Sequence, residues 1–555
     1  MSSATSKIDT GRAASAAPAF LSPAACGPWL DALVRNDPKN RLVELERQIE
    51  RLNGHQLPAA ERFAILELLR APVHSALTDN RREFADRPLP LKPAEQAALD
   101  ASLATWCGLA DGYLRCVDAC RERETGTEGQ LAVTVQRALT ALAELQLDCY
   151  RSGRNVTAGH WRKVHRAYAA AEAAGLAQEP VTDALRRGRS PATPFGAWSE
   201  ALLLQLASLQ ELPARQLGWV AHWVRRWSGK LELRNDLPPA SRSAPLFLDI
   251  ESDQPAGYRA TSSGAQRILD TSQLKRSLKK RILALEDGQS PAELGLGEDC
   301  VQPHARELLV QMYFRWCKGG ATRRHERRGA AGTCVVIGGL DAAHFHISGG
   351  MALERPDRTL SDEEIRRQRE EIAVFGRILA TPGTPGAHQP QQGANKHQEA
   401  MEFWRLVDQS PAGLQLVRRA DQPGQRFVGK QLVAVRAPDM KVLHLGTVRR
   451  ATIDTDNALH AGVRILAGEP VAIMVRGTGL NEIRSKAVPA FFLPEIPSLA
   501  EPSTIILPSG WFKRERVLEV LPSQDWKIRL TGLVERGSDH ERATYETMSA
   551  VRRGA

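Results

Sequence analysis

The sequence contains no hydrophobic run long enough to cross a lipid bilayer. A spanning helix needs about 20 consecutive, mostly apolar residues. The uncharged stretch at residues 13–30 includes three prolines, and its apolar residues are mostly alanine. It also lacks the compact apolar segment of a secretory signal. We therefore expect residues 1–30 to form a flexible leader and the protein to be cytoplasmic, without a membrane span.

Cysteine is sparse and is not arranged for metal or redox chemistry. The eight cysteines are scattered along the chain, and no Cys-x-x-Cys pair occurs. Cys116 and Cys120 would lie on one face of a helix, where we interpret them as small core residues. Scattered thiols are typical of a reducing compartment. We expect neither a metal site nor a cofactor.

Aromatic residues are also few, at 5% of the chain. No predicted strand alternates aromatic with basic side chains, as a single-stranded nucleic-acid surface would. The net charge of +10 permits a phosphate-bearing partner without requiring one. Because 555 residues are too many for one core, we expect roughly two to four domains.

From residue 31 to 317 the apolar residues recur at helical spacing. Residues 133–150 place Val135, Leu139 and Leu142 on one face, and a second helix ends where Gly175 is positioned as a C-cap. We expect an all-helical domain without a fixed repeat period and with a break near 235–245. Its other helices are predicted near 44–54, 59–70, 94–121, 196–211 and 264–286.

After residue 318 the pattern changes to short β-rich segments separated by Gly, Pro and Asp, typical of a small antiparallel barrel. We expect this barrel over 318–480, including a strand at 343–348. A capped helix at 361–379 and a Pro/Gly-rich loop form an insertion at 350–400. Residues 485–545 are predicted to form a further small β domain, so the fold class is α+β multidomain.

Two polar motifs accompany the predicted barrel. The first, "RRHERR" at 323–328, contains four arginines just before a strand. An arginine fork can bind guanine N7 and O6 or clamp a phosphate. The second, "DQSPAG" at 408–413, supplies the carboxylate of Asp408, the hydroxyl of Ser410 and, at Gly413, room for close backbone approach. Together they could hold a small guanine nucleotide.

With "VGKQLVAV", "LGTVRR" and "HAGVRIL" behind them, these motifs resemble the PilZ domain, the bacterial receptor for cyclic di-GMP. The resemblance covers about residues 320–480. The family's Arg-x-x-x-Arg motif fits Arg323 and Arg327, and equally Arg324 and Arg328. We prefer the first pair because the family often doubles the arginine at the first position.

The resemblance assigns further positions and a function. Asp408, Ser410 and Gly413 fit the family's Asp/Asn-x-Ser-x-x-Gly motif, and Gly462 resembles its late barrel glycine. It implies a non-catalytic receptor that binds cyclic di-GMP. Ligand would order the arginine segment and change the arrangement of the domains. We expect a downstream protein partner to bind through the helical domain.

Two other polar motifs and two other functions compete with this interpretation. "GQRFVGK" at 424–430 matches part of a phosphate loop, but Gln431 and a predicted strand follow it instead of Ser or Thr and a helix. His344 and His346 would share a strand face, without an evident third metal ligand. The alternatives to a receptor are a scaffold protein with a degenerate barrel and a basic nucleic-acid-binding protein, which we expect least. No nucleophile–base constellation is evident, so we expect no enzymatic activity.

Overall fold

The computed structural model describes residues 17–34, 37–186, 192–234, 236–237, 244–260, 265–320, 327–349, 400–478, 487–521 and 526–548. The predicted insertion at 350–400, with its helix and loop, and the arginines at 323 and 324 lie outside these ranges. The chain divides into two compact units. One comprises Met1–Arg324 with Thr452–Asp456, and the other His325–Ala451 with Asn457–Ala555.

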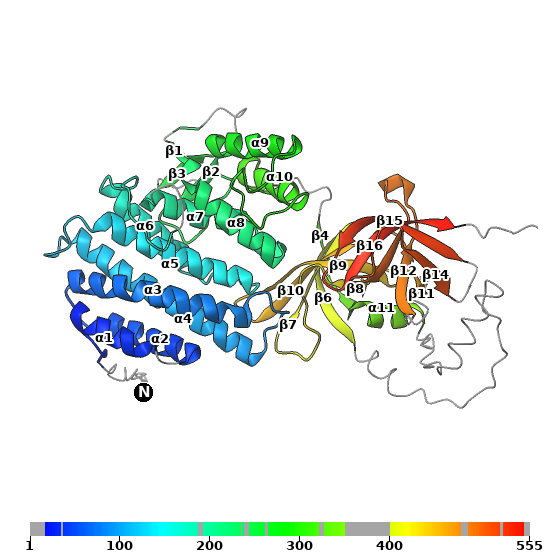
Figure 1. Ribbon diagram of the computed structural model, residues 1–555, viewed down its shortest axis with the longest axis horizontal. Coiled ribbons are helices and arrows are strands. Elements are labelled where there is room, and N and C mark those ends of the chain that lie inside the picture. The colour runs from blue at the N-terminus through cyan, green and yellow to red at the C-terminus, as the bar shows by residue number, and fades with distance from the viewer. Residues whose placement is uncertain are drawn as a thin grey trace, which may run out of the picture. The chain divides into compact units, whose positions relative to one another are not determined.

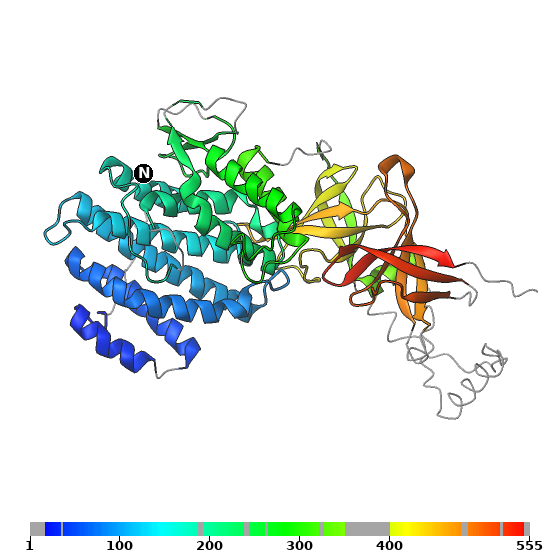
Figure 2. The ribbon, with the colours of Figure 1, turned by 45° about the horizontal axis from the view of Figure 1, so that its top comes forward.

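The first unit is built mainly from helices. Figures 1 and 2 show them stacked largely in chain order, from blue to green, in both views. Short 3₁₀ turns follow α7 at Leu209–Glu211 and α8 at Ser228–Lys230. The helices are α1 (Pro23–Leu33), α2 (Pro38–Gly54), α3 (Ala59–Phe84), α4 (Pro93–Arg121), α5 (Leu131–Arg151), α6 (His160–Ala173), α7 (Pro194–Leu206), α8 (Ala214–Trp227), α9 (Ser272–Glu286) and α10 (His304–Cys317).

Helix α1 corrects the prediction of a flexible leader over residues 1–30. The Ser22 hydroxyl caps the helix by accepting from the backbone N–H of Ala25, and Pro23 occupies the first helical position. Phe20 and Cys26 are buried in the core of the unit. Of the three prolines that argued against a membrane span, Pro23 therefore fits the start of a packed helix, and Pro28 lies inside it.

A small sheet corrects the prediction that residues 31–317 are entirely helical. Strands β1 (Glu232–Arg234), β2 (Leu246–Asp249) and β3 (Gln266–Asp270) form an antiparallel sheet in the order β1-β3-β2. The predicted helix at 264–286 therefore begins only at Ser272. Residues of β3 pair on both sides, and such a short apolar segment does not distinguish a central strand from the first turn of a helix.

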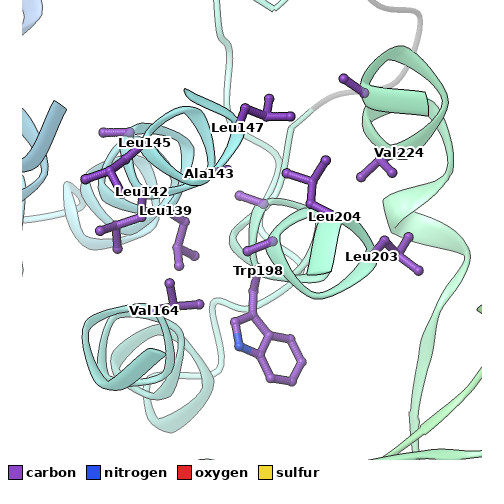
Figure 3. Packing of buried hydrophobic residues seen from close by; sticks show 14 of the residues in the cluster. Leu139, Leu142, Ala143, Leu145, Leu147, Val164, Trp198, Leu203, Leu204 and Val224 are labelled. Carbon is purple, nitrogen blue, oxygen red and sulfur yellow. The ribbon is translucent and has the colours of Figure 1, made fainter. Parts of the chain in front are cut away.

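Helix α5 lies at the centre of the unit and is buried nearly all round. Figure 3 shows Leu139 and Leu142 of α5 close to Val164 of α6 and Trp198 of α7. The predicted apolar face of α5 is confirmed as buried. Its charged residues are buried as well, and they include Arg137, Glu144 and Asp148.

The second unit contains two six-stranded antiparallel barrels. The first closes in the order β6-β5-β8-β9-β10-β7, with β7 returning to β6, and β4 (Arg328–Gly329) pairs with the free edge of β6. Figure 2 shows the two sets of strands side by side, coloured yellow and orange to red. The strands of the first barrel are β5 (Thr333–Gly338), β6 (Met401–Ser410), β7 (Gly413–Arg419), β8 (Leu432–Arg436), β9 (His444–Ile453) and β10 (Ala458–Ile465).

The second barrel begins earlier than predicted. It closes as β11-β12-β13-β16-β15-β14. Because β11 pairs with β12 and β14, residues 471–477 belong to this barrel and not to the first. Its strands are β11 (Val471–Gly477), β12 (Val488–Leu493), β13 (Thr504–Pro508), β14 (Val517–Leu521), β15 (Lys527–Arg536) and β16 (His540–Met548), and a 3₁₀ turn lies at Pro497–Leu499.

Helix α11 (Leu340–Ile347) replaces the strand predicted at 343–348. Gly339, with φ of +88°, ends β5 and turns the chain into the helix, a conformation that favours glycine. Buried residues of both barrels and of α11 form one hydrophobic cluster. Within it the Nε2 atom of His344 lies 2.9 Å from the carbonyl oxygen of Ile473. The two predicted strand-face histidines are therefore helical residues, and His344 packs between the barrels.

None of the described helices is both long and apolar enough to span a membrane.

Candidate functional site

The "DQSPAG" motif forms the tip of the β6–β7 hairpin. Ser410 pairs with Gly413 across a turn of two residues, Pro411 and Ala412. The Ser410 hydroxyl donates a hydrogen bond of 3.3 Å to the carbonyl oxygen of Gly413. The hairpin therefore holds the polar side chains of the motif at one end of the first barrel.

A bulge in β6 directs Asp408 away from the barrel interior. Leu406 pairs with Leu416 and Asp408 with Gln415, so the register shifts by one residue between them. In a regular strand, residues 406 and 408 would share a face. The shift lets Leu406 stay in the core, where it is buried, while the carboxylate of Asp408 lies on the other face.

Strand pairing then aligns three candidate site residues across β6, β7 and β10, two of them predicted from the sequence and one not. Asp408 of β6 pairs with Gln415 of β7, which in turn pairs with Gly462 of β10. Residues that pair across antiparallel strands project to the same face. Gln415 was not predicted, although its position as a polar residue between two leucines of a β-rich segment could have singled it out.

The two site glycines have different physical roles. A Cβ atom on Gly413 would lie 2.7 Å from the carbonyl oxygen of Val463, so this position requires glycine for close backbone approach. A Cβ atom on Gly462 would meet nothing nearer than Gln415 Oε1, at 3.6 Å. The nearest neighbours do not require glycine there, and Gly462 places no side chain beside Gln415, in a position where both residues are buried.

The first motif reaches this row through β4 and Arg327. Gly329 of β4 pairs with Asp408, and Arg328 pairs with Gln409. Arg327 Nη1 donates to Asp408 Oδ1 at 2.8 Å, and the two side chains are 37% and 26% exposed. Arg328 projects to the opposite face with Gln409. The structure thus brings Arg327, and not Arg328, to Asp408.

The second barrel contributes a residue near the edge of the same face. Arg464 of β10 pairs with Gly413 and forms an ion pair with Glu535 of β15. No sequence motif indicated Glu535. The described residues contain no cluster of three or more His, Cys, Asp or Glu side chains that could hold a metal ion. Strand β8 begins at Leu432, directly after "GQRFVGK" and Gln431, so this segment lacks the helix of a phosphate loop.

We predict that the two glycines respond differently to an added methyl group. Gly413→Ala must displace the Val463 backbone and should lower the free energy of unfolding by about 1–3 kcal/mol. Gly462→Ala serves as the matched control and should change it by less than about 0.5 kcal/mol. Denaturant unfolding of the full chain measures both. Equal losses would show that the close approach at Gly413 does not constrain the hairpin.

In the sequence, the candidate site lies between two segments that match known domain families. Residues 24–239 match the family model of the N-terminal domain of the cyclic-di-GMP receptor FimW, and residues 473–548 match the FimW C-terminal β-barrel domain. Over 516 residues the chain is 24% identical to the cyclic-di-GMP receptor FimW of Pseudomonas aeruginosa, covering 86% of this chain and 83% of that protein. The PilZ-like barrel lies between the two matched domains. The two domain matches and the full-length relative together support assignment of the chain to a cyclic-di-GMP receptor family.

Proposed function

We propose that this protein is a non-catalytic receptor for cyclic di-GMP and that the ligand binds on the first barrel. The observation that carries the proposal is the convergence of Arg327, Asp408 and Gly462 on one face, in a chain that matches two FimW domain models. The name of the P. aeruginosa relative supports the same ligand and a receptor role. The family match does not favour a scaffold or a nucleic-acid-binding protein.

The geometry suggests how a guanine would be bound. The carboxylate of Asp408 can accept from the guanine N1–H and N2–H groups, and the Arg327 fork can bind O6 and N7 or a phosphate. Gly462 contributes no side chain beside the buried Gln415, where the ring would bind. Arg323, or Arg324, would supply the second arginine of the motif, and Ser410 and Gly413 shape the hairpin tip.

The ion pair between Arg327 and Asp408 does not prevent binding. A partly exposed pair contributes about 0–1 kcal/mol to stability. A hydrogen bond to a charged group contributes about 1.5–3 kcal/mol, so a ligand that engages either side chain can offset the loss of the pair. The pair also keeps both groups at the site before the ligand arrives.

The proposed compartment is the cytoplasm. All eight cysteines are free thiols, and burial raises the pKa of several of them, to about 11 for Cys334 and about 12 for Cys149. Unpaired thiols in a chain of this size fit a reducing environment.

Arg327→Ala should weaken the binding of cyclic di-GMP by about 2–3 kcal/mol, roughly thirty- to a hundredfold, because a charge-assisted contact is lost. Isothermal titration of the full chain measures the change. Arg419→Ala is the matched control, since it removes an exposed arginine that is paired with Asp421 at the far end of β7. If Arg328→Ala weakened binding and Arg327→Ala did not, the motif would have to be reassigned to Arg324 and Arg328.

We further propose that binding changes the arrangement of the domains. Helix α10 is anchored in the helical core by Leu308, Met312 and Trp316, which are buried on one face as predicted. Only nine residues separate its last residue, Cys317, from Arg327. A ligand held by Arg327 therefore acts close in sequence to the helical unit, and it shifts the arrangement by its differential affinity for the two states.

Small-angle X-ray scattering tests this switch. Cyclic di-GMP should change the radius of gyration of the wild-type chain, and the same concentration should leave the Arg327→Ala variant unchanged. Superimposable wild-type curves with and without bound ligand would contradict the switch, while the receptor assignment would stand.

A further inference from the structure

The helical unit contains a cavity of about 700 Å³ to which neither PilZ-like motif contributes. Its walls come from α3, α4, α5, α7, α8, α9, the 3₁₀ turn at Ser228–Lys230 and the segment at 183–186. Small-molecule sites in proteins commonly measure about 300–1,000 Å³. The cavity therefore has the size of a ligand site that is separate from the candidate site on the barrel.

The lining of this cavity is strongly basic. Seven of the lining side chains are arginine or lysine, and three are carboxylates, namely Glu144, Asp183 and Glu200. Cations thus exceed anions by four. An excess of one charge sign within a concave, partly apolar wall focuses the electrostatic potential on an oppositely charged ligand.

Every carboxylate of the lining is engaged by an arginine. Arg225 bridges Glu144 and Glu200, with 3.3 Å from its Nε to Glu200, and Arg70 contacts Asp183. Burial alone would raise the pKa of Glu144 and Asp183, but the surrounding arginines bring it below the ordinary value. These carboxylates are ionised at neutral pH, and their charge is already balanced.

Three other cations of the lining have no such balance. Arg226, Lys230 and Arg281 form no ion pair with any residue that the structure describes. Burial lowers the pKa of Arg281, and the charge of Arg226 lowers it further. A dianion would relieve this repulsion, whereas a neutral ligand would not.

Two of these three cations, Arg226 and Arg281, are held in place by neighbouring residues. Arg281 Nε donates to the carbonyl oxygen of Leu294 at 3.2 Å, and its guanidinium lies 5.2 Å from the ring centroid of Trp227. The guanidinium of Arg226 packs on the next residue, Gly295, where an added Cβ atom would lie 2.7 Å from Cζ. Both guanidinium groups therefore contact the turn at Leu294 and Gly295. Little side-chain freedom remains to be lost when a ligand binds.

Trp227, whose ring lies beside the Arg281 guanidinium, gives a second indication that a polar group is missing next to these cations. The residue lines the cavity and is fully buried, yet its indole N–H has no hydrogen-bond partner among the described residues. An unsatisfied buried donor is unfavourable, because it has lost its hydrogen bonds to water without replacement. The carboxylates of the lining are all paired within the protein. Arg226, Lys230 and Arg281 have no ion pair, and the Trp227 indole N–H has no hydrogen-bond partner, among the described residues.

We propose that the cavity binds a small phosphate-bearing molecule of up to nucleotide size, with Arg226, Lys230 and Arg281 around the phosphate. Two planar guanidinium forks and an ammonium group match the charge and the several oxygens of a dianionic phosphate. This site is distinct from the one proposed on the barrel and does not depend on it.

Inorganic pyrophosphate is the first probe, titrated calorimetrically into the full chain, with GMP and AMP as nucleotide probes. We expect saturable binding that Arg226→Gln/Lys230→Gln weakens by about tenfold or more, because charge-assisted contacts are lost. The matched control, Lys279→Gln/Lys280→Gln, removes two exposed charges of α9 that do not line the cavity and should leave binding unchanged. The Arg327→Ala variant should also bind pyrophosphate normally.

Three outcomes would overturn the proposal. They are the absence of binding by any of the three probes, an equal loss in the α9 control, and loss of pyrophosphate binding in Arg327→Ala, which would place the anion on the barrel. If the double cavity variant does not fold, Lys230→Gln alone removes one half-buried cation without an ion pair and preserves the test.

Discussion

The antiparallel register of β6, β7 and β10 determines where every candidate contact on the barrel lies. A slip of one residue would send Asp408, Gln415 and Gly462 to the opposite face. Two local features hold the register. The bulge before Asp408 separates the carboxylate from buried Leu406, and the close approach of Gly413 to the Val463 carbonyl leaves no room for a side chain. The electrostatic contact with Arg327 is possible only because this backbone arrangement comes first.

The sequence motifs singled out candidate residues that the structure brings to one face of the first barrel, while several surrounding elements were predicted incorrectly. Asp408, Gly413 and Gly462 were identified because short motifs specify them. The bulge was not, since one inserted residue leaves no mark in an apolar alternation. The segment at 343–348 alternates like a strand, but a turn at Gly339 and packing between the barrels make it a helix. Residues 266–270 were assigned to a helix because their pairing partners lie elsewhere in the sequence.

The charged residues around the cavity of the helical unit could not be predicted from the helical period of the sequence. A period of 3.6 residues identified the apolar face of α5 and implied that its other face meets solvent. Because α5 is central, Arg137, Glu144 and Asp148 are also inside, and arginines from other helices balance the carboxylates. Such pairing is invisible in one helix considered alone. Of the unbalanced cations, Arg226 and Lys230 are four positions apart, but Arg281 follows Lys230 by 51 positions, so no single local motif could reveal all three.

Hydrogen exchange of the full chain with and without cyclic di-GMP tests the central claim, that the ligand lies on the outer face of β6, β7 and β10. Cyclic di-AMP is the matched comparison, because adenine lacks the N1–H and N2–H donors that Asp408 would accept. The account predicts slower exchange at residues 327–330, 406–416 and 458–465 with cyclic di-GMP, and little change with cyclic di-AMP. Unchanged exchange in these strands under conditions of bound ligand, or slowing confined to the helical unit, would contradict it.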